Sequence, residues 1–476
     1  MIDLKNLTIE KAHEGFKNKE FTCRELVQEY LKVIKEKNAE LNAYLEIYDD
    51  ILNQADEAQK KFETGIATIL TGIPFAIKDN ILFAGHKASA GSKILENYVA
   101  VYDSTVVKEL KKQGAILIGR TNMDEFAMGS STQTSAFGVS RNPYDISRVP
   151  GGSSGGSAVA VAGDMALVAL GTDTCGSVRQ PSSFCGLVGL KPTYGAISRN
   201  GIIAMGNSLD QVSPFGKNVR DVEIVFNALS KYDPMDSTSI KDRVSPDTQK
   251  PSFSFAFKIG VPWHLFEKGV DPEVMDNFNK SIEKLKNSGY KIIDIKLPYS
   301  RYSLETYYII MPAEVSTNLS RFDGMRYGFS DKGENLMKVY KKSRGRGFGK
   351  EARRRILLGT YVLSHGYYDA YYNKAIKVRE KIKEEMLKAF ENVDFIVTPT
   401  TPTSAFKLGE KLDDPVAMYL CDIFAAPANL TGIPAIAIPS GKDKNGLPLS
   451  IQFMASHFCE NSLFEIGKKF EVLKEE

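Results

Sequence analysis

The clearest amphipathic pattern near the start of the chain follows a threonine at position 22. Apolar side chains recur at helical spacing at Leu26, Tyr30 and Ile34. Thr22 and Glu25 precede them as a T-x-x-E pair, in which each side chain can accept a hydrogen bond from the other residue's backbone N–H. The pattern therefore predicts an amphipathic helix that begins at Thr22.

Helix-like and strand-like stretches then alternate as far as residue 232. The helical pattern STVVKELKKQG (104–114) precedes the apolar run AILIGRTN (115–122), and SAVAVAG (157–163) precedes MALVALGT (165–172). Helices that alternate with short apolar strands are typical of α/β proteins. The first half of the chain therefore predicts an α/β fold with a mainly parallel or mixed sheet.

The second half of the chain interrupts this alternation and then resumes it. Residues 232–253 are polar and contain prolines, as expected of a surface connection, and residues 255–375 are rich in Tyr, Lys and Arg. A helical pattern returns at 377–393, and a D-K-N-G turn at 443–446 joins two apolar strands as a hairpin. We expect one domain over residues 1–476, with 255–375 as a helical insertion within it.

The composition is that of a globular protein with a sizeable core. Of the 476 residues, 43% are hydrophobic and 25% are charged. The 61 Lys and Arg residues against 58 Asp and Glu residues leave a formal net charge of +3. So small an excess does not by itself predict nucleic-acid binding.

Cysteine usage and hydropathy indicate the compartment. The five cysteines are scattered, without a CxxC pair or a metal-ligand spacing, which suits a reducing compartment better than a disulfide scaffold. The N-terminal sequence MIDLKNLTIEKAHEGF lacks the unbroken apolar core of a signal peptide. The apolar run AVAVAGDMALVALG is interrupted by Asp164 and is too short to span a bilayer. We expect a cytoplasmic protein without a membrane segment.

The glycine-rich stretch GGSSGGS, residues 151–157, is the first candidate for chemistry. A phosphate-binding Walker A loop ends in G-K-[ST], but Ser157 and Ala158 stand where its Lys and Ser/Thr belong. Ser153 and Ser154 each match the G-x-S-x-G of a nucleophile elbow, but the residues before them are polar and contain two prolines instead of forming a buried strand. A flexible linker would not lead directly into the apolar stretch that follows. The remaining interpretation is a rigid loop that presents its serines to a site.

A second loop of small residues, GTDTCGSVRQPSSFCG (171–186), carries Ser177. Consecutive backbone N–H groups in such a turn can converge on an oxyanion. A serine nucleophile also needs a base, and none of the five histidines stands in a recognisable partner motif. Lys78, in the apolar stretch TGIPFAIKDN, can serve if burial lowers its pKa to near 7, a shift worth about 4–5 kcal/mol. Taken alone Lys78 fits an ion-paired surface lysine, whereas beside two serine loops it is a candidate base.

These three motifs, in this order and spacing, resemble those of the amidase signature family. The motifs are GIPFAIKDN around Lys78, VPGGSSGGSAVAVA around Ser153 and GTDTCGSVRQPSSFCGLVGLKPTYG around Ser177, and DEFAMGSST, SLDQVSPFG and PTTPT extend the resemblance over nearly the whole chain. The resemblance implies an amidase-signature α/β fold, with a mixed, mainly parallel central sheet covered by helices. It also implies amide hydrolysis by a Ser-Ser-Lys triad, in which Ser177 forms the acyl-enzyme, Ser153 relays the proton and Lys78 is the base.

The same resemblance implies details of the two loops. The family's relay serine follows a cis peptide bond, which here would be Gly152–Ser153. The oxyanion would be held by backbone N–H groups, those of Thr174, Cys175, Gly176 and Ser177. Two residues depart from the family's pattern, because Cys175 replaces a glycine of GTDTGGS and Asn200 stands where relatives usually carry an aromatic residue. A side chain with a Cβ is disfavoured at positive φ, so we expect a loop held by its neighbours, with the thiol buried and not acting as the nucleophile.

Three further segments resemble a branch of the family, the glutaminase subunits of tRNA-dependent amidotransferases. They are SLETYYIIMPAEVSTNLSRFDGMRYG (303–328), GFGKEARRRILLGT (347–360) and MYLCDIFAAPANLTGIP (418–434). The resemblance places glutamine on Tyr307, Arg355 and Asp422, with Arg355 on the α-carboxylate and Asp422 on the α-ammonium. From the residues alone, Arg355 is one charge in a basic run, Asp422 a helix-surface acid and Tyr307 a core aromatic.

The function that this branch implies belongs to a complex. The chain would release ammonia from glutamine, and its partner, the B subunit, would use ATP and Mg to amidate the glutamate on mischarged Glu-tRNA(Gln). A small third protein, the C subunit, would join the two, and this chain would need no cofactor or metal of its own. A stand-alone amidase with another substrate and an inactive scaffold that only assembles partners are the alternatives.

Overall fold

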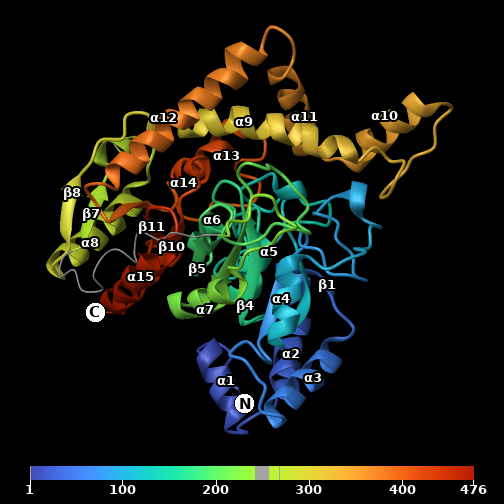
Figure 1. Cartoon of the computed structure of the whole chain (residues 1–476), viewed down its shortest axis with the longest axis vertical. Helices are drawn as coiled ribbons and strands as arrows, with labels where there is room; N and C mark the ends of the chain where they lie inside the picture. The colour runs from blue at the N-terminus through green and yellow to red at the C-terminus, as the bar shows by residue number, and fades with distance from the viewer. Residues whose placement is uncertain (1, 242–256, 267, 476) are drawn as a thin grey trace.

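The computed structural model describes residues 2–241, 257–266 and 268–475, which are arranged around an eleven-stranded sheet (Figure 1). The strands are β1 (Tyr44–Ile47), β2 (Pro74–Lys78), β3 (Ile116–Thr121), β4 (Val168–Asp173), β5 (Val188–Lys191), β6 (Gln211–Gly216), β7 (Lys258–Val261), β8 (Lys291–Asp294), β9 (Phe395–Pro399), β10 (Ala435–Lys442) and β11 (Pro448–Met454). Their order across the sheet is β1-β3-β2-β4-β6-β5-β10-β11-β9-β7-β8.

The mixed sheet confirms the predicted α/β class but corrects the expectation of a mainly parallel sheet. Among the described strands, four pairings are parallel and six are antiparallel. Parallel pairs occur where helices separate the strands in sequence, as in β2–β3, β2–β4 and β7–β8. The middle of the sheet reverses direction at each step, including the predicted hairpin of β10 and β11.

Helices cover both faces of this sheet and extend beyond it (Figure 1). They are α1 (Ile9–Lys17), α2 (Cys23–Leu41), α3 (Ile51–Glu63), α4 (Thr105–Gln113), α5 (Gly155–Ala162), α6 (Arg179–Phe184), α7 (Val219–Leu229), α8 (Pro272–Asn287), α9 (Ser303–Asn318), α10 (Leu336–Gly347), α11 (Lys350–Val362), α12 (Lys374–Ala389), α13 (Pro415–Tyr419), α14 (Ala426–Thr431) and α15 (Glu460–Glu475). None of the helices in the described ranges combines the length and apolar character needed to cross a membrane.

Several predicted elements are confirmed. Helix α2 follows Thr22, whose side chain and that of Glu25 form the reciprocal capping box that the T-x-x-E signature predicts. The two helix-then-strand units are α4 with β3 and α5 with β4. The helix α1, which precedes the capping box, is not among the predicted elements.

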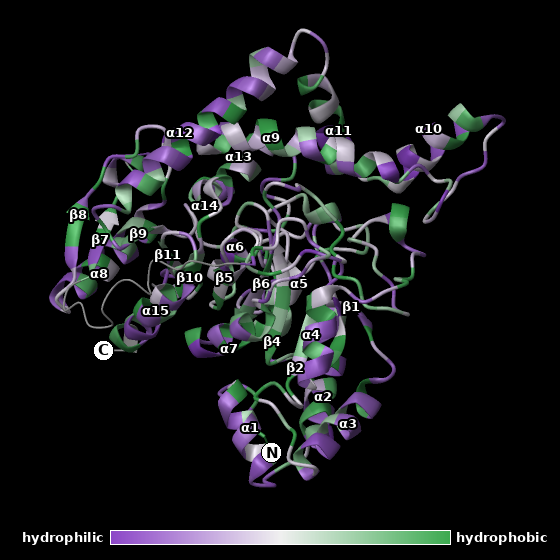
Figure 2. Cartoon of the chain, in the orientation of Figure 1, coloured by the Kyte–Doolittle hydropathy of each residue, from purple (hydrophilic) through white to green (hydrophobic). Residues whose placement is uncertain are grey.

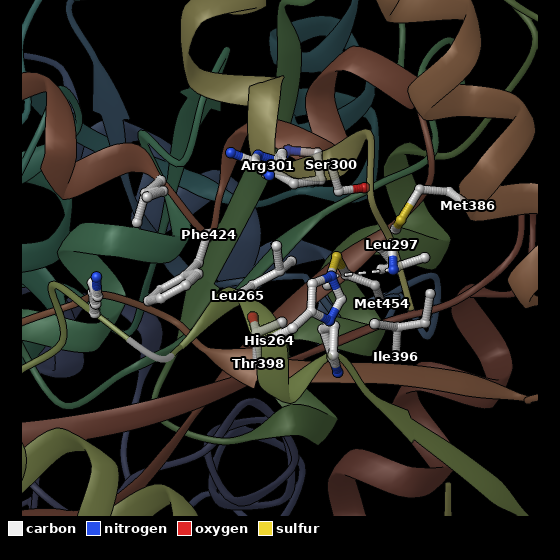
Figure 3. Close-up of a pocket in the computed structure, with 14 residues that line it drawn as sticks. His264, Leu265, Leu297, Ser300, Arg301, Met386, Ile396, Thr398, Phe424 and Met454 are labelled. Atoms are coloured by element: carbon white, nitrogen blue, oxygen red, sulfur yellow. Dashed lines mark hydrogen bonds between the residues drawn. The ribbon is translucent and has the colours of Figure 1, made fainter. Parts of the chain in front are cut away.

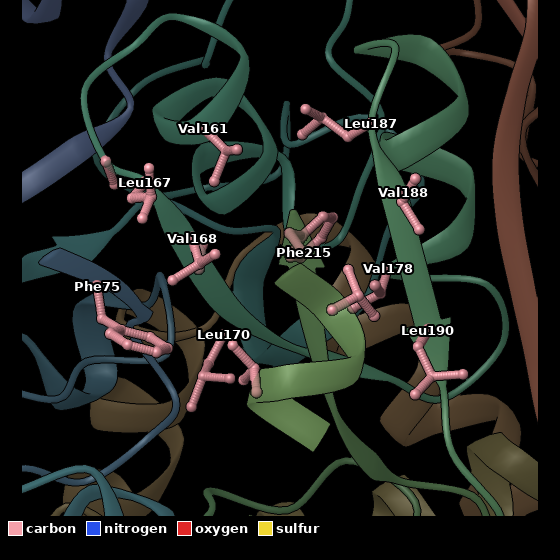
Figure 4. Packing of buried hydrophobic residues seen from close by; sticks show 14 of the residues in the cluster. Phe75, Val161, Leu167, Val168, Leu170, Val178, Leu187, Val188, Leu190 and Phe215 are labelled. Atoms are coloured by element: carbon pink, nitrogen blue, oxygen red, sulfur yellow. The ribbon is translucent and has the colours of Figure 1, made fainter. Parts of the chain in front are cut away.

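The core explains why the central strands read as unbroken apolar runs. All residues of β2, β3 and β4 are buried, because helices pack on both faces of the sheet. Figure 4 shows Phe75 of β2, Val168 and Leu170 of β4 and Phe215 of β6 packed in one cluster, each without exposed surface. In Figure 2 the central strand β4 is hydrophobic, whereas outer helices such as α3 and α12 are largely hydrophilic.

The segment expected as a helical insertion, residues 255–375, is not wholly helical. It contributes β7 and β8, which extend the sheet beyond β9, as well as helices α8 to α11. Helices α9, α10 and α11 form an arm along one side of the molecule, with α10 at its far end (Figure 1). Residues 242–253 of the expected surface connection, like residues 255 and 256, lie outside the described ranges.

Helices α9 and α11 cross at a glycine. A Cβ placed on Gly359 of α11 would lie 1.8 Å from the carbonyl oxygen of Pro312 in α9. That separation is far below van der Waals contact, so the helices approach closely only because position 359 lacks a side chain. The crossing sets the position of α11 relative to α9.

We therefore expect Gly359→Ala to lower the free energy of unfolding by about 1–3 kcal/mol, since the added methyl group must push the two helices apart. Gly345→Ala is the matched control, because Gly345 is an exposed α10 residue. Apart from its two neighbours and the backbone of its own helix, no atom of the described residues lies within 4 Å of the point where its Cβ would lie. There the helix preference of alanine should stabilise the protein by about 0.5–1 kcal/mol. Urea denaturation of both variants measures the two effects, and equal effects would contradict the close crossing.

Candidate active site

Lys78 ends the buried strand β2 and points its amine at the glycine-rich loop and at strand β4. The side chain is fully buried, and its Nζ lies 2.8 Å from Ser153 Oγ, 2.7 Å from Ser154 Oγ and 2.9 Å from Thr172 Oγ1. Asn80 donates to the same Thr172 hydroxyl at 3.0 Å. The structure thus joins Lys78 directly to Ser153, and it adds Ser154 and Thr172, which the sequence analysis did not assign to the site.

Burial sets the protonation state of this lysine. Desolvation lowers the pKa of Lys78 to about 7, while the negative charges of Asp124, Asp210 and Asp173 oppose the shift. None of these carboxylates makes a hydrogen bond to Nζ within the described chain. Above neutral pH the amine is therefore largely unprotonated, and its lone pair can accept the hydroxyl proton of Ser153.

The glycine-rich loop that carries Ser153 is held by backbone hydrogen bonds and by one aspartate. The peptide bond between Gly152 and Ser153 is cis, as the family resemblance implies. The carbonyl of Ser153 accepts from the N–H of Asp124 at 3.1 Å, and Gln180 accepts from the N–H of Gly152 at 2.8 Å. The Asp124 carboxylate itself accepts from the N–H groups of a neighbouring turn, including that of Thr132 at 2.8 Å. The loop is therefore rigid, as predicted, and is not a linker.

Ser177 lies in the loop between β4 and α6, beside the glycine-rich loop. Its backbone carbonyl accepts from the N–H of Ser154 at 3.2 Å, so the two loops are in contact. In the described structure the Ser177 hydroxyl makes no hydrogen bond, and Ser177 is 5% exposed. A hydroxyl at the surface of the site and free of internal partners is available to a substrate.

A buried ion pair shapes the Ser177 loop. Asp173 at the end of β4 and Arg179 at the start of α6 are both wholly buried and lie 3.1 Å apart. The Asp173 carboxylate also accepts from the N–H groups of Gly176 at 2.8 Å and Val178 at 3.2 Å. Arg179 holds the pKa of Asp173 down, at about 2, against the desolvation that would raise it. The loop therefore folds around a permanent negative charge.

One member of the predicted oxyanion site already has a partner. The N–H of Gly176 donates to Asp173 at 2.8 Å, so its part in holding an oxyanion stays a prediction. The N–H groups of Thr174, Cys175 and Ser177 have no acceptor within the described residues. Three of the four predicted donors are thus free to bind an oxyanion.

Cys175 does not carry the backbone strain that its glycine-like position suggested. The left-handed residue of the loop is Gly176, with φ of 88°, and Cys175 is not among the residues with positive φ. Burial raises the pKa of the Cys175 thiol well above its usual value, so the sulfur stays protonated. The thiol is a small buried side chain beside the free N–H groups, in keeping with the expectation that it is not a nucleophile.

The arm brings Tyr307, Arg355 and Asp422 together. Tyr307 lies on α9, Arg355 on α11 and Asp422 just before α14, and all three are buried. The pKa of Tyr307 is raised by burial and by its neighbours Cys175 and Asp422, whereas the charge of Arg355 lowers it. The three residues therefore lie near Cys175 of the Ser177 loop, although they are far apart in sequence.

Both charged members of this group have further partners that sequence analysis missed. Burial raises the pKa of Asp422 to about 7, although its carboxylate accepts from Ser130 Oγ and from the Tyr308 hydroxyl, each at 3.0 Å. Arg355 donates through Nε to Glu351 at 2.8 Å and lies under the rings of Tyr308 and Tyr419. The DEFAMGSST motif that contains Ser130 was the available signal for that contact, while Glu351 stands one helical turn before Arg355.

Comparisons with known proteins identify the family. The sequence profile of the family described as Amidase matches residues 25–464. The A subunit of glutamyl-tRNA(Gln) amidotransferase from Thermoanaerobacter pseudethanolicus is 48% identical over 479 residues, covering 99% of this chain and 97% of that protein. The crystal structure of the A subunit of glutamyl-tRNA(Gln) amidotransferase from Thermotoga maritima is 41% identical, with a TM-score of 0.79 over 98% of this chain and 94% of that one. Native peptide amidase from Stenotrophomonas maltophilia gives a TM-score of 0.80 at 26% identity, covering 99% of this chain and 98% of that one.

The burial of Lys78 predicts a pH-dependent stability. Between a pKa of about 7 in the folded protein and about 10.5 in the unfolded chain, only the unfolded state carries the proton, so unfolding binds a proton. The free energy of unfolding of the wild type should then rise with pH by about 1.4 kcal/mol per unit relative to Lys78→Met. Urea denaturation at pH 7, 8 and 9 measures this difference. The exposed Lys280→Met is the control, and a Lys78→Met difference that does not change with pH would contradict a neutral Lys78.

Proposed function

This chain belongs to the amidase family, and we propose that it is the glutaminase subunit of a tRNA-dependent amidotransferase. In this proposal the chain hydrolyses glutamine and supplies ammonia for the conversion of Glu-tRNA(Gln) to Gln-tRNA(Gln). The name of the relatives at about 48% identity over nearly the full chain supports it. The observation that carries it is the presence of two buried groups of opposite charge, Arg355 and Asp422, near Cys175 of the Ser177 loop.

This pair matches the charges of a free amino acid. The guanidinium of Arg355 suits the α-carboxylate, which it can bind through two parallel hydrogen bonds. Asp422 suits the α-ammonium, since a bound cation would favour the ionised form of a carboxyl whose pKa burial raises to about 7. A stand-alone amidase that acts on uncharged amides has no need of two opposite buried charges. Glutamine, with a zwitterionic head and a terminal amide, uses both.

The proposed chemistry runs from Lys78 to the substrate amide. Neutral Lys78 accepts the hydroxyl proton of Ser153. Ser153 in turn accepts the hydroxyl proton of Ser177 while Ser177 Oγ forms a bond to the amide carbon. The negative oxygen that results is held by the free N–H groups of the loop, those of Thr174, Cys175 and Ser177. The proton returns through Ser153 to the leaving nitrogen, and the C–N bond breaks to release ammonia.

Water then completes the cycle. It adds to the Ser177 ester while its proton passes through Ser153 to Lys78. Collapse of this second intermediate breaks the C–O bond to Ser177, whose oxygen recovers a proton by the same route. Glutamate leaves and the free hydroxyl of Ser177 is restored. Two serines and one lysine of this chain are sufficient for both steps, without a metal or cofactor.

The ammonia acceptor lies outside this chain in the proposal. The partner known as the B subunit uses ATP and Mg to activate the glutamate of mischarged tRNA, and the small C subunit joins the two. The amidotransferase name of the relatives, which are themselves subunits, supports a partnered protein. We place the reaction in the cytoplasm, where the five free cysteines stay reduced. An inactive scaffold fits less well, because Lys78, Ser153 and Ser177 are all present in adjoining positions.

Ser177→Ala tests the nucleophile. We expect glutamine hydrolysis to fall at least about a thousandfold, since no other group in the site can form the acyl-enzyme and the loss of one member disables the unit. Cys175→Ser is the control in the same loop and should keep activity within about tenfold, or 1.4 kcal/mol of barrier. Ammonia release by the purified variants, in the presence of the two partner proteins, gives both values. An active Ser177→Ala together with an inactive Cys175→Ser would overturn the serine mechanism in favour of the thiol.

Arg355→Ala tests the identity of the substrate. We expect kcat/KM for glutamine to fall, mainly through a higher KM, because the α-carboxylate loses its charged partner. The fall should correspond to a loss of about 2–5 kcal/mol of stabilisation free energy. A small amide without an α-carboxylate should be hydrolysed as well by the variant as by the wild type. The exposed Arg353→Ala is the control for the general effect of charge in this basic run. If both substrates lose activity equally, Arg355 is structural and the chain is an amidase of another substrate class.

A further inference from the structure

A hollow lies beside the segment that carries Phe424, two residues after Asp422 in the sequence. Its volume is about 340 Å³, and it is closed in by the 3₁₀ turn Trp263–Leu265, by strand β9 and by helix α12 (Figure 3). None of Lys78, Ser153 and Ser177 lines it. This volume falls within the range of about 300–1,000 Å³ that is usual for small-molecule pockets. The cavity is therefore large enough for a small organic molecule, and it is separate from the proposed catalytic site.

Most of the cavity wall is apolar. Its apolar side chains come from six parts of the fold and include Leu265, Leu297, Met386, Ile396, Phe424 and Met454. The methionine and leucine side chains can adjust to the shape of a flexible guest. A wall of this kind favours the hydrocarbon part of a ligand, because burial removes that part from water. Polar metabolites such as free glutamine would lose hydration in it without compensation.

The wall also contains one polar group without a partner. His264 Nε2 accepts a hydrogen bond from the N–H of Leu297 at 3.2 Å, so the neutral ring carries its proton on Nδ1. Nδ1 is buried and has no acceptor among the described residues. A buried donor without an acceptor is unfavourable. Because this nitrogen is buried, a ligand in the cavity reaches it only if the His264 ring turns.

The two charged side chains that line the cavity are both positive, while the Glu385 carboxylate lies behind the wall and accepts from the N–H and the hydroxyl of the lining residue Ser300 at 2.9 and 2.8 Å. Lys268 and Arg301 line it and are exposed, and neither forms an ion pair with a carboxylate of the described residues. No Asp or Glu is among the lining residues. Two unpaired cations at the solvent side of an apolar hollow favour an anionic head group there. The apolar wall and the two exposed cations together favour an amphiphile as the ligand.

We propose that this cavity is a binding site for a small monoanion with an apolar body, of the class of medium-chain carboxylates. The hydrocarbon chain lies against the leucine and methionine side chains, and the carboxylate lies at the mouth, near Arg301 and Lys268. This assignment goes beyond the proposed amide hydrolysis and does not depend on it. It concerns a different cavity and a different class of ligand.

The protein contains its own reporter for this site. Trp263 is the sole tryptophan of the sequence, and it stands between the lining residues Pro262 and His264. Its ring packs edge-on against Phe278, with 5.6 Å between the centroids. A guest that moves the neighbouring His264 or Leu265 changes the surroundings of the indole. Tryptophan fluorescence of the full chain can therefore follow binding.

The experiment titrates the purified full-length chain with octanoate and with 1-octanol. We expect octanoate to bind at one saturable site, which equilibrium dialysis of labelled octanoate counts, with at least tenfold higher affinity than 1-octanol of the same chain length. Arg301→Gln should reduce octanoate affinity about fivefold or more and leave 1-octanol unchanged. Lys296→Gln is the matched control, because Lys296 is an exposed cation next to Leu297 in sequence but is outside the cavity lining. It should change neither.

Two further variants locate the bound molecule. Leu265→Phe adds volume to the wall without adding a tryptophan, and it should weaken both probes at least tenfold. If that variant is unstable in thermal unfolding, Met386→Phe fills the same hollow from α12. The proposal is overturned if no saturable octanoate binding is found up to 5–10 mM, a dissociation constant that corresponds to a binding free energy of roughly −3 kcal/mol. It is also overturned if both probes bind with equal affinity, or if neither filling variant weakens octanoate binding. Glutamine hydrolysis is measured separately, so failure here leaves the proposed function untouched.

Discussion

The ion pair between Asp173 and Arg179 is the interaction on which the candidate site depends. Both side chains are wholly buried, and an unpaired charge in that position would be strongly destabilising. Asp173 gathers the N–H groups of the Ser177 loop, while Arg179 donates to Gln452 of β11 and to Asn429 of α14. The pair therefore ties the loop to the central strands and to the helix that follows Asp422. Neither partner reacts in the proposed chemistry, yet both position the groups that do.

Lys78 illustrates the opposite use of burial. The fold leaves its amine among hydroxyl groups and keeps carboxylates at a distance, so desolvation dominates and the pKa falls to about 7. A carboxylate in hydrogen-bond contact would stabilise the fold and would also keep the lysine protonated and unable to act as a base. The site thus gives up stability in exchange for a neutral amine. Ser154 and Thr172, which share the amine with Ser153, fix its direction.

Chemistry and recognition lie on different parts of the molecule. Lys78, Ser153 and Ser177 belong to the ends of sheet strands and the loops after them, which are held on two sides by buried helices. Tyr307 and Arg355 belong to the arm, whose helices meet at Gly359. In the proposed function, a change in the arm can therefore alter which amide is bound without disturbing the proton path. The positions of Tyr307 and Arg355 depend on the close approach of α9 and α11, which a single methyl group would disturb.

The sequence by itself determined the motifs and the elements that local patterns encode. The capping box at Thr22, the helix–strand units and the β10–β11 hairpin follow from neighbours a few residues apart, and the three motifs singled out Lys78, Ser153 and Ser177. Tertiary structure alone decided the strand directions, because these depend on which distant strands pair. It also decided that Gly176 gives its N–H to Asp173, that positive φ falls on Gly176 rather than on Cys175, and that Ser130 and Tyr308 meet Asp422. Such contacts join residues more than a hundred positions apart or depend on loop geometry, and no periodicity in a single sequence records them.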